Sequence, residues 1–170
     1  MSYPNMAGMR ARSQLKDTQT QVKSALMDAQ RTAIKKGQTC TLTFTKTNSG
    51  TANEKMVITS TPADCITSGG GGDDSVVSDT DDTPQKVSSK IELRKKISGR
   101  NVITNISGGT IEFSYKGTTT LSDSGTIILQ STGTPNVKCL VISSPLGIIR
   151  SGNYEGSLSP INSNNCNTSL

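Results

Sequence analysis

The chain has 170 residues and a net charge of +5, and it is poor in the side chains that catalysis uses most. Only 31% of the residues are hydrophobic and 3% aromatic, whereas Ser and Thr together supply 46 residues. Histidine is absent, which removes Ser-His and Cys-His nucleophile activation and the commonest zinc ligand. We therefore expect one domain with a thin core, no enzymatic activity and no cofactor.

Residues 1–37 predict one long basic helix that ends at a glycine. Apolar side chains recur along it at a 3.6-residue period, and they are Leu15, Val22, Leu26, Ala29 and Ala33. A helix from about Pro4 to Lys36 would run roughly 50 Å at ~1.5 Å per residue. One small β domain cannot bury that whole length. We therefore expect the upper, N-terminal half of the helix to project and to contact a partner.

Residues 38–170 predict a β-rich domain. Alternating apolar residues predict a hairpin from strands 39–45 and 55–59. Further strands are expected at 90–94, 101–106, 110–115, 126–130, 138–143 and 148–150, with glycines between them at the spacing of a meander. Residues 154–170 are rich in Asn and Ser and predict an irregular tail. The expected fold is α+β, with a long N-terminal helix packed on antiparallel sheet in two layers of strands.

Two charged runs interrupt this pattern. Residues 68–85 are glycine-rich and acidic, which predicts a mobile loop. Five aspartates in that segment could gather calcium by number, but they lack the ordered spacing of a calcium loop, so we predict no metal site. The basic run 86–100 includes Arg94 and Lys96, which share one face of a strand. This run is either a phosphate-binding stripe or a solvated face opposite the acidic loop.

Two stretches of the chain resemble the GspH/FimT family of type IV minor pilins and type II secretion pseudopilins. The first is residues 26–38 (LMDAQRTAIKKGQ), which match the family's helix end entering a strand. The second runs from 111–113 and Gly117, through 125–127, to 141–147 (VISSPLG), and it matches the β-rich C-terminal half with its closing turn. Tyr3-Pro4-Asn5 resembles the point where pilin helices leave the membrane.

The resemblance implies a minor pilin, a structural or assembly-initiating subunit of a type IV pilus. Its partners would be other pilin subunits, contacted through the N-terminal helix at 1–37, while 38–170 would form the globular pilin domain. A prepilin leader and an apolar membrane-inserting segment are expected to precede residue 1. The full-length protein would be anchored in the inner membrane before assembly and extracellular in the pilus. A pseudopilin of a type II secretion system is the alternative on the same fold.

Some family members act as DNA receptors in natural transformation through a Gly-Arg-x-Arg motif. The matching positions here are 147–150 (GIIR), so Arg150 is kept while Ile148 replaces the first arginine. A DNA-binding minor pilin is therefore a second alternative. Its candidate DNA-binding residues are Arg150, Lys138, Lys116, Arg94 and Lys96. A surface-binding adhesin would need exposed aromatic residues, and only Tyr115 and Tyr154 are candidates.

Four cysteines, evenly split between the two ends of the chain, indicate an oxidising compartment. They allow three pairings. We favour Cys40–Cys65, which closes the early hairpin. We also favour Cys139–Cys166, which pins the C-terminal tail to a strand and resembles the terminal disulfide loop of many pilins. Each loop would stabilise the fold by roughly 3 kcal/mol in the chain-entropy model.

Overall fold

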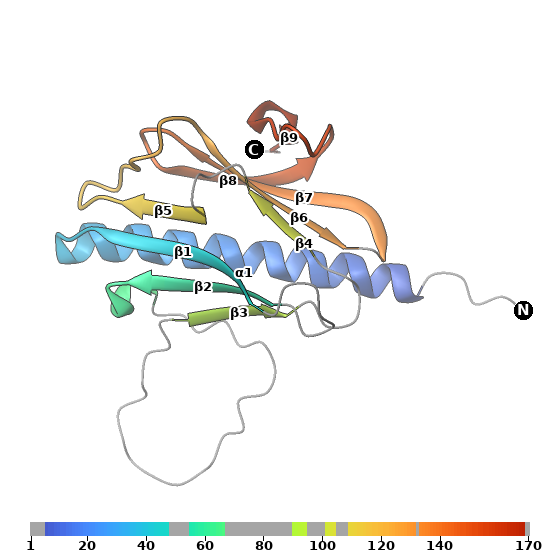
Figure 1. Ribbon diagram of the computed structural model, residues 1–170, viewed down its shortest axis with the longest axis horizontal. Helices are drawn as coiled ribbons and strands as arrows, with labels where there is room; N and C mark the ends of the chain where they lie inside the picture. Colours follow the sequence, from blue (N-terminus) through green and yellow to red (C-terminus); the bar gives the residue numbers. More distant parts are fainter. Residues whose placement is uncertain are drawn as a thin grey trace, which may run out of the picture.

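The computed structural model describes residues 6–47, 55–66, 90–94, 101–104, 109–131 and 133–168. In this part of the chain, one long N-terminal helix, α1 (Met6–Lys36), packs against two antiparallel sheets (Figure 1). The expected α+β fold is therefore confirmed. Residues 1–5 and the acidic segment 68–85 lie outside the described residues, and so does most of the basic run 86–100.

Helix α1 buries the apolar stripe that its sequence predicts. All five stripe residues are 1% exposed or less: Leu15, Val22, Leu26, Ala29 and Ala33. The helix then ends in a Schellman arrangement. In it the Gln38 amide donates to the Ala33 carbonyl (3.1 Å) and the Gly37 amide donates to the Ile34 carbonyl (3.3 Å). The stop at Gly37 is thus built by backbone hydrogen bonds, as the glycine indicates.

The N-terminal half of α1 does not project from the β-rich part, so this expectation was wrong. Burial begins at Ala11, which is 3% exposed, and Thr18 is equally covered. The physical reason is that the second sheet follows the helix further than the sequence pattern indicates, because one of its strands begins at Thr134 rather than at residue 138. Exposed apolar side chains on this half are found at Met6 and Met9.

The first sheet has the strand order β3-β2-β1-β5. Its strands are β1 (Cys40–Thr47), β2 (Lys55–Thr61), β3 (Lys90–Arg94) and β5 (Thr110–Phe113). Strand β1 is central, and its alternation places Cys40 and Leu42 in the core while the intervening threonines stay partly exposed. A short 3-10 helix, η1 (Ala63–Cys65), follows β2. The predicted hairpin of β1 and β2 is confirmed.

The second sheet has the order β4-β6-β7-β8-β9. Its strands are β4 (Asn101–Thr104), β6 (Gly125–Ser131), β7 (Thr134–Ser143), β8 (Ile148–Tyr154) and β9 (Cys166–Asn167). The chain crosses between the sheets from β3 to β4, from β4 to β5 and from β5 to β6, so the expected meander from residue 90 onward is interrupted. Consecutive strands lie side by side from β1 to β3 in the first sheet and from β6 to β9 in the second. This crossing allows both sheets to cover the one helix (Figure 1).

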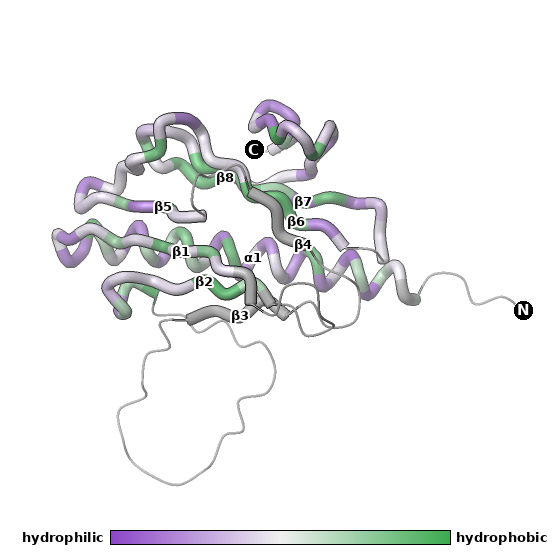
Figure 2. The backbone as a smooth tube through the Cα atoms, viewed as in Figure 1, coloured by the Kyte–Doolittle hydropathy of each residue, from purple (hydrophilic) through white to green (hydrophobic). Residues whose placement is uncertain are grey.

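The main core lies between α1 and both sheets. It combines the helix stripe with aliphatic and aromatic residues from the strands, among them Leu42, Ile58, Ile111, Phe113, Ile127, Leu140 and Ile142. Figure 2 shows these hydrophobic stretches of β6 and β7 running alongside the helix. Small Ala29 and Ala33 allow the sheets to approach the last turns of α1 closely.

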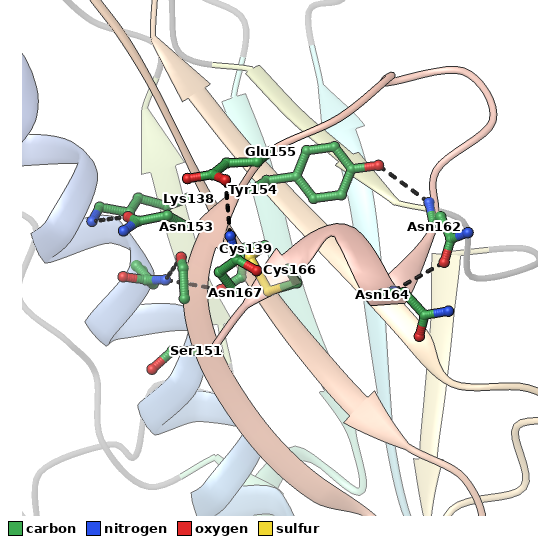
Figure 3. Close-up of a disulfide and its surroundings, with 12 residues drawn as sticks. Lys138, Cys139, Ser151, Asn153, Tyr154, Glu155, Asn162, Asn164, Cys166 and Asn167 are labelled. Carbon is green, nitrogen blue, oxygen red and sulfur yellow. Dashed lines mark hydrogen bonds between the residues drawn. A yellow bond between two sulfur atoms is a disulfide. The ribbon is translucent and has the colours of Figure 1, made fainter. Parts of the chain in front are cut away.

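Both favoured disulfides are present. Cys40 pairs with Cys65 at a Cα–Cα distance of 5.8 Å, and Cys139 pairs with Cys166 at 5.9 Å. The first bond joins β1 to η1 within the main core. The second joins β7 to β9 and holds the C-terminal segment against the outer face of the second sheet (Figure 3).

Candidate functional site

The helix is tied to the sheets by two glutamines that sequence reasoning missed. Gln19 Nε2 donates to the carbonyls of Cys139 (2.8 Å) and Gly152 (2.9 Å), which belong to β7 and β8. Gln30 Nε2 donates to the carbonyls of Gly117 (2.7 Å) and Gly147 (3.0 Å). These glutamines are about three helical turns apart and therefore share one side of α1. The signal available in the sequence is a polar residue repeating beside the apolar stripe.

Gln30 joins two turns that come from different sheets. The turn after β5 contains Gly117, and the turn between β7 and β8 contains Gly147. A Cβ atom on Gly147 would lie 2.5 Å from the Gly117 carbonyl oxygen, and the Gly147 φ angle is +68°. Only glycine fits this approach without displacing backbone. A backbone hydrogen bond from the Thr119 amide to the Pro145 carbonyl (2.9 Å) fixes the same contact.

These two turns and the end of α1 carry exposed apolar side chains. Ile34, Tyr115 and Leu146 are 53%, 54% and 63% exposed. Lys116 Nζ lies 5.5 Å from the centroid of the Tyr115 ring, within the range of a cation–π contact. This end of the molecule thus combines apolar and cationic groups on a surface that backbone and glutamine contacts hold in place.

The C-terminal segment covers a second, smaller apolar cluster on the outer face of the second sheet. Its buried members are Ile128, Cys139, Val141, Tyr154 and Cys166. The Tyr154 hydroxyl donates to the Ser157 carbonyl (2.7 Å) and accepts from the Asn162 amide (3.2 Å; Figure 3). Gly152 lies under the segment, where a Cβ atom would stand 2.0 Å from the Asn167 carbonyl oxygen. The C-terminal segment is therefore packed against the outer face of the second sheet and covers this apolar cluster.

The structure separates the candidate DNA-binding residues into two groups. Arg150 lies opposite Val141 in the β7–β8 ladder and so shares the outer face with it, whereas Lys138 alternates with Cys139 and faces the other way. Lys138 Nζ donates to Asn153 Oδ1 at 2.6 Å (Figure 3). Arg150 Nη2 donates to Ser143 Oγ at 3.1 Å, beside the turn that approaches Gly117.

Lys116 and Arg150 thus come to the same end of the molecule, and Lys138 does not join them. Arg94 lies in β3 opposite Lys55. The side chain of Arg94 and all of Lys96 lie outside the described residues, so their role stays a prediction. Of the two candidate aromatic residues for an adhesin, Tyr154 is only 5% exposed. Tyr115 is the exposed one.

One ion pair links the end of α1 to η1. Lys36 Nζ contacts Asp64 Oδ2, and both side chains are about half exposed. The hydrogen bond from Lys36 lowers the pKa of Asp64 below its ordinary value. Among the residues that the structure describes, no group of three His, Cys, Asp or Glu side chains could hold a metal ion. In the same residues, no helix is both long and apolar enough to cross a membrane.

One solved structure places this architecture among known proteins. The type IV minor pilin FimU of Pseudomonas aeruginosa strain PAO1 matches the fold with a TM-score of 0.51 and 13% sequence identity. The match covers 82% of this chain and 88% of FimU. No protein-family model matches the sequence, and no curated protein matches it. At this identity the likeness concerns the fold, so we conclude that the chain has a pilin-like α+β fold of the kind seen in a type IV minor pilin.

Proposed function

We propose that this protein is a minor pilin, a non-catalytic subunit that helps to initiate assembly of a type IV pilus. The observation that carries the proposal is the FimU-like fold across 82% of the chain. A long helix with its stripe buried against two sheets leaves loops and helix ends for contacts with other subunits. On this proposal the full-length protein is anchored in the inner membrane before assembly and becomes extracellular in the pilus.

Contacts with other pilin subunits are proposed to run through the N-terminal end of α1. Met6 and Met9 are each 70% exposed. Burying a methionine side chain in an interface would stabilise that interface by about 1.5–3 kcal/mol, so these two residues favour a contact with another subunit. The middle of the exposed helix face is polar, with Ser13, Thr20 and Ser24 turned to solvent. Apolar packing against neighbouring helices is therefore expected at the Met6–Met9 end, beyond the part of α1 that the sheets cover.

The test is to follow the full-length protein in the cells that produce it. Pili are sheared from the surface, and immunoblotting measures the protein in the pilus fraction. We expect the protein in that fraction and a severe loss of pili per cell when its gene is deleted. Met6→Asp with Met9→Asp should remove the protein from pili, while the matched control Ser13→Asp with Thr20→Asp should leave it there.

Two results would contradict the proposed role in the pilus. A protein that is absent from pili, in cells whose pilus number does not change on deletion, would exclude the pilus role. If that deletion instead blocked secretion of folded proteins, the pseudopilin alternative would replace it.

DNA binding is the second candidate function, and one observation favours it. Lys116 and Arg150 lie at the same end of the molecule, so two of the candidate cations could meet one phosphate backbone. The test is a fluorescence-anisotropy titration with a short DNA duplex at two salt concentrations. Micromolar binding that weakens steeply with salt and is lost in Arg150→Ala would support this function. Absence of binding at low salt would exclude this second function, and the structural role in the pilus would be the one that remains.

A further inference from the structure

The end of the molecule where α1 stops carries a surface that the proposed assembly role does not yet use. We call it the helix-end surface, and it consists of Ile34, Tyr115 and Leu146 with the cations Arg31, Lys35 and Lys116. Each of the three apolar side chains is more than half exposed. Single exposed apolar residues are ordinary on protein surfaces, but a group of them framed by charges marks a contact site.

Three elements bring these residues together. Arg31, Ile34 and Lys35 are neighbours on the last turns of α1 by their three- and four-residue spacing. A Cβ atom on Gly117 would lie 2.8 Å from Ile34 Cδ1, which places the Tyr115–Gly117 turn directly against the helix. The Gly147 carbonyl shares Gln30 Nε2 with that of Gly117, which brings the Leu146 turn beside them.

The helix-end surface cannot bury its own apolar groups by a simple collapse of the turns. Gln30 holds both turns through their carbonyls, and the Thr119 amide bonds to the Pro145 carbonyl at 2.9 Å. The exposed side chains are therefore presented on a fixed backbone. A fixed surface loses little conformational entropy when a partner binds to it.

The charge of this end is positive. The elements that form it carry five cations, Arg31, Lys35, Lys36, Lys116 and Arg150. Among the residues that the structure describes, they carry four carboxylates, Asp28, Asp64, Glu112 and Asp123, and Asp64 is already paired with Lys36. Electrostatic complementarity therefore calls for a partner with carboxylates around an apolar centre.

The opposite end of α1 argues against a second copy of this chain as that partner. Exposed Met6 and Met9 lie there beside exposed Arg10 and Arg12. Stacking two copies end to end would bring these arginines against Arg31, Lys35 and Lys116. Like charges brought together at an interface suppress that pairing. A DNA backbone would engage the cations but would leave the apolar side chains without contacts.

We propose that the helix-end surface binds a different protein subunit through an apolar patch rimmed by aspartate or glutamate. The inference builds on the proposed function, since the partner would be a second kind of pilin subunit. It gives this chain a defined role in assembly. It would join a chemically distinct neighbour at the end of α1 and would not extend a filament of its own copies.

Carbodiimide cross-linking of isolated pili tests the chemistry directly. The reagent activates carboxylates, which then form amides with lysine amines that touch them, and mass spectrometry identifies the joined peptides. We expect Lys35 or Lys116 linked to an Asp or Glu of another subunit, at least tenfold more often than the exposed control Lys16. Links only to residues 73–82 of this chain would overturn the proposal of a different subunit. Absence of links at Lys35 and Lys116 would overturn the proposal that the helix-end surface contacts another subunit.

Charge reversal separates this inference from the pilus role. Lys35→Glu with Lys116→Glu should lower the amount of the protein in sheared pili at least tenfold. Lys16→Glu with Ser13→Asp and Ser24→Asp makes the same change of net charge at exposed positions elsewhere on α1 and should leave that amount unchanged. Circular dichroism checks that both variants fold. If the unmodified protein is in pili and both variants remain, only the inference fails. If the unmodified protein is absent from pili, the proposed function fails and the inference with it.

Discussion

The two apolar clusters of this protein are closed by disulfides of similar span but are built differently. The main core takes one face of a long helix and the inner faces of two sheets. The outer cluster has few buried members and is covered by the irregular segment 155–168. The disulfide spans are 25 residues for Cys40–Cys65 and 27 for Cys139–Cys166. Disulfides of similar span therefore cross-link the large main core, at Cys40–Cys65, and the small outer cluster, at Cys139–Cys166.

The stability of the two regions comes from different sources. In the main core, aliphatic side chains from many elements are withdrawn from water, so hydrophobic burial dominates. The outer cluster offers much less apolar area, so its cover depends on specific contacts. These are the Cys139–Cys166 bond, the Tyr154 hydroxyl and the close backbone passage over Gly152. Substitutions in the main core should therefore lower the stability of the whole fold, whereas substitutions in the outer cluster should affect the C-terminal segment locally.

We expect the greatest loss of folding stability from a substitution at the centre of the main core. Leu26 is fully buried, so Leu26→Asp would place a charge without a partner among aliphatic side chains. We expect a loss of more than about 5 kcal/mol, enough to abolish cooperative folding. Ser24→Asp is the matched control on the exposed face, and it should stay within about 0.5 kcal/mol. Urea denaturation followed by circular dichroism measures both. Equal stability of the Leu26 variant and its parent would contradict helix–sheet packing as the basis of the fold.

The next effect compares the two disulfides. In the chain-entropy model each contributes about 3–4 kcal/mol. Cys40→Ala with Cys65→Ala should lower global stability by about that amount, because β1 and η1 cannot detach from the core separately. Cys139→Ala with Cys166→Ala should instead release the cover locally. Hydrogen exchange should then accelerate in 155–168 with little change in the urea midpoint of the rest.

A matching loss of global stability in both double variants would contradict this division. It would mean that the outer cluster unfolds together with the main core as one cooperative unit. Exchange rates in α1 provide the internal control, because they should rise only in the Cys40–Cys65 variant.

The same division explains what the sequence could predict. The stripe from Leu15 to Ala33 and the strand at 90–94 follow simple periods, and they appear where predicted. Both favoured cysteine pairs are formed. The reach of the second sheet along α1 was missed, because residues 134–137 (TPNV) show no clean alternation and contain a proline.

The contacts that build the candidate surfaces were beyond sequence reasoning for a different reason. Gln19 and Gln30 act through backbone carbonyls, and any residue type could supply those. The chain gives no local signal of which carbonyls lie nearby, since they are separated from the glutamines by 87 to 133 residues. Lys138 and Arg150 were both candidate DNA-binding residues, but they lie on different faces of the second sheet. Their opposite faces follow from a ladder register that the sequence does not specify.

A smaller effect is expected under the C-terminal segment. In Gly152→Ala the new methyl group would lie 2.0 Å from the Asn167 carbonyl oxygen, so the backbone of β9 must move. Overpacking of this kind costs about 1–3 kcal/mol. Gly156→Ala is the control, because its methyl would meet the Asn165 side chain, which can rotate away. Hydrogen exchange in 155–168 should rise clearly more in the Gly152 variant. Equal exchange in the two variants would show that β9 is not held in this close passage.

The smallest effect concerns the edge of the main core, where Lys36 pairs with Asp64. The hydrogen bond from Lys36 lowers the pKa of Asp64, so the folded protein holds this carboxylate ionised at a pH where the unfolded chain begins to bind a proton. The stabilisation is therefore complete above the ordinary aspartate pKa of about 3.9, and it is lost as pH falls through the lowered pKa of the folded state. Because the pair is about half exposed, 1 M salt should weaken it as well.

Comparing thermal midpoints of the parent and Asp64→Asn between pH 6 and pH 2.5 isolates this contribution. The two midpoints should differ slightly at pH 6, and the difference should shrink as the pH falls toward 2.5. A constant difference across that range would mean that Asp64 acts through the packing of η1 against α1 and not through its charge.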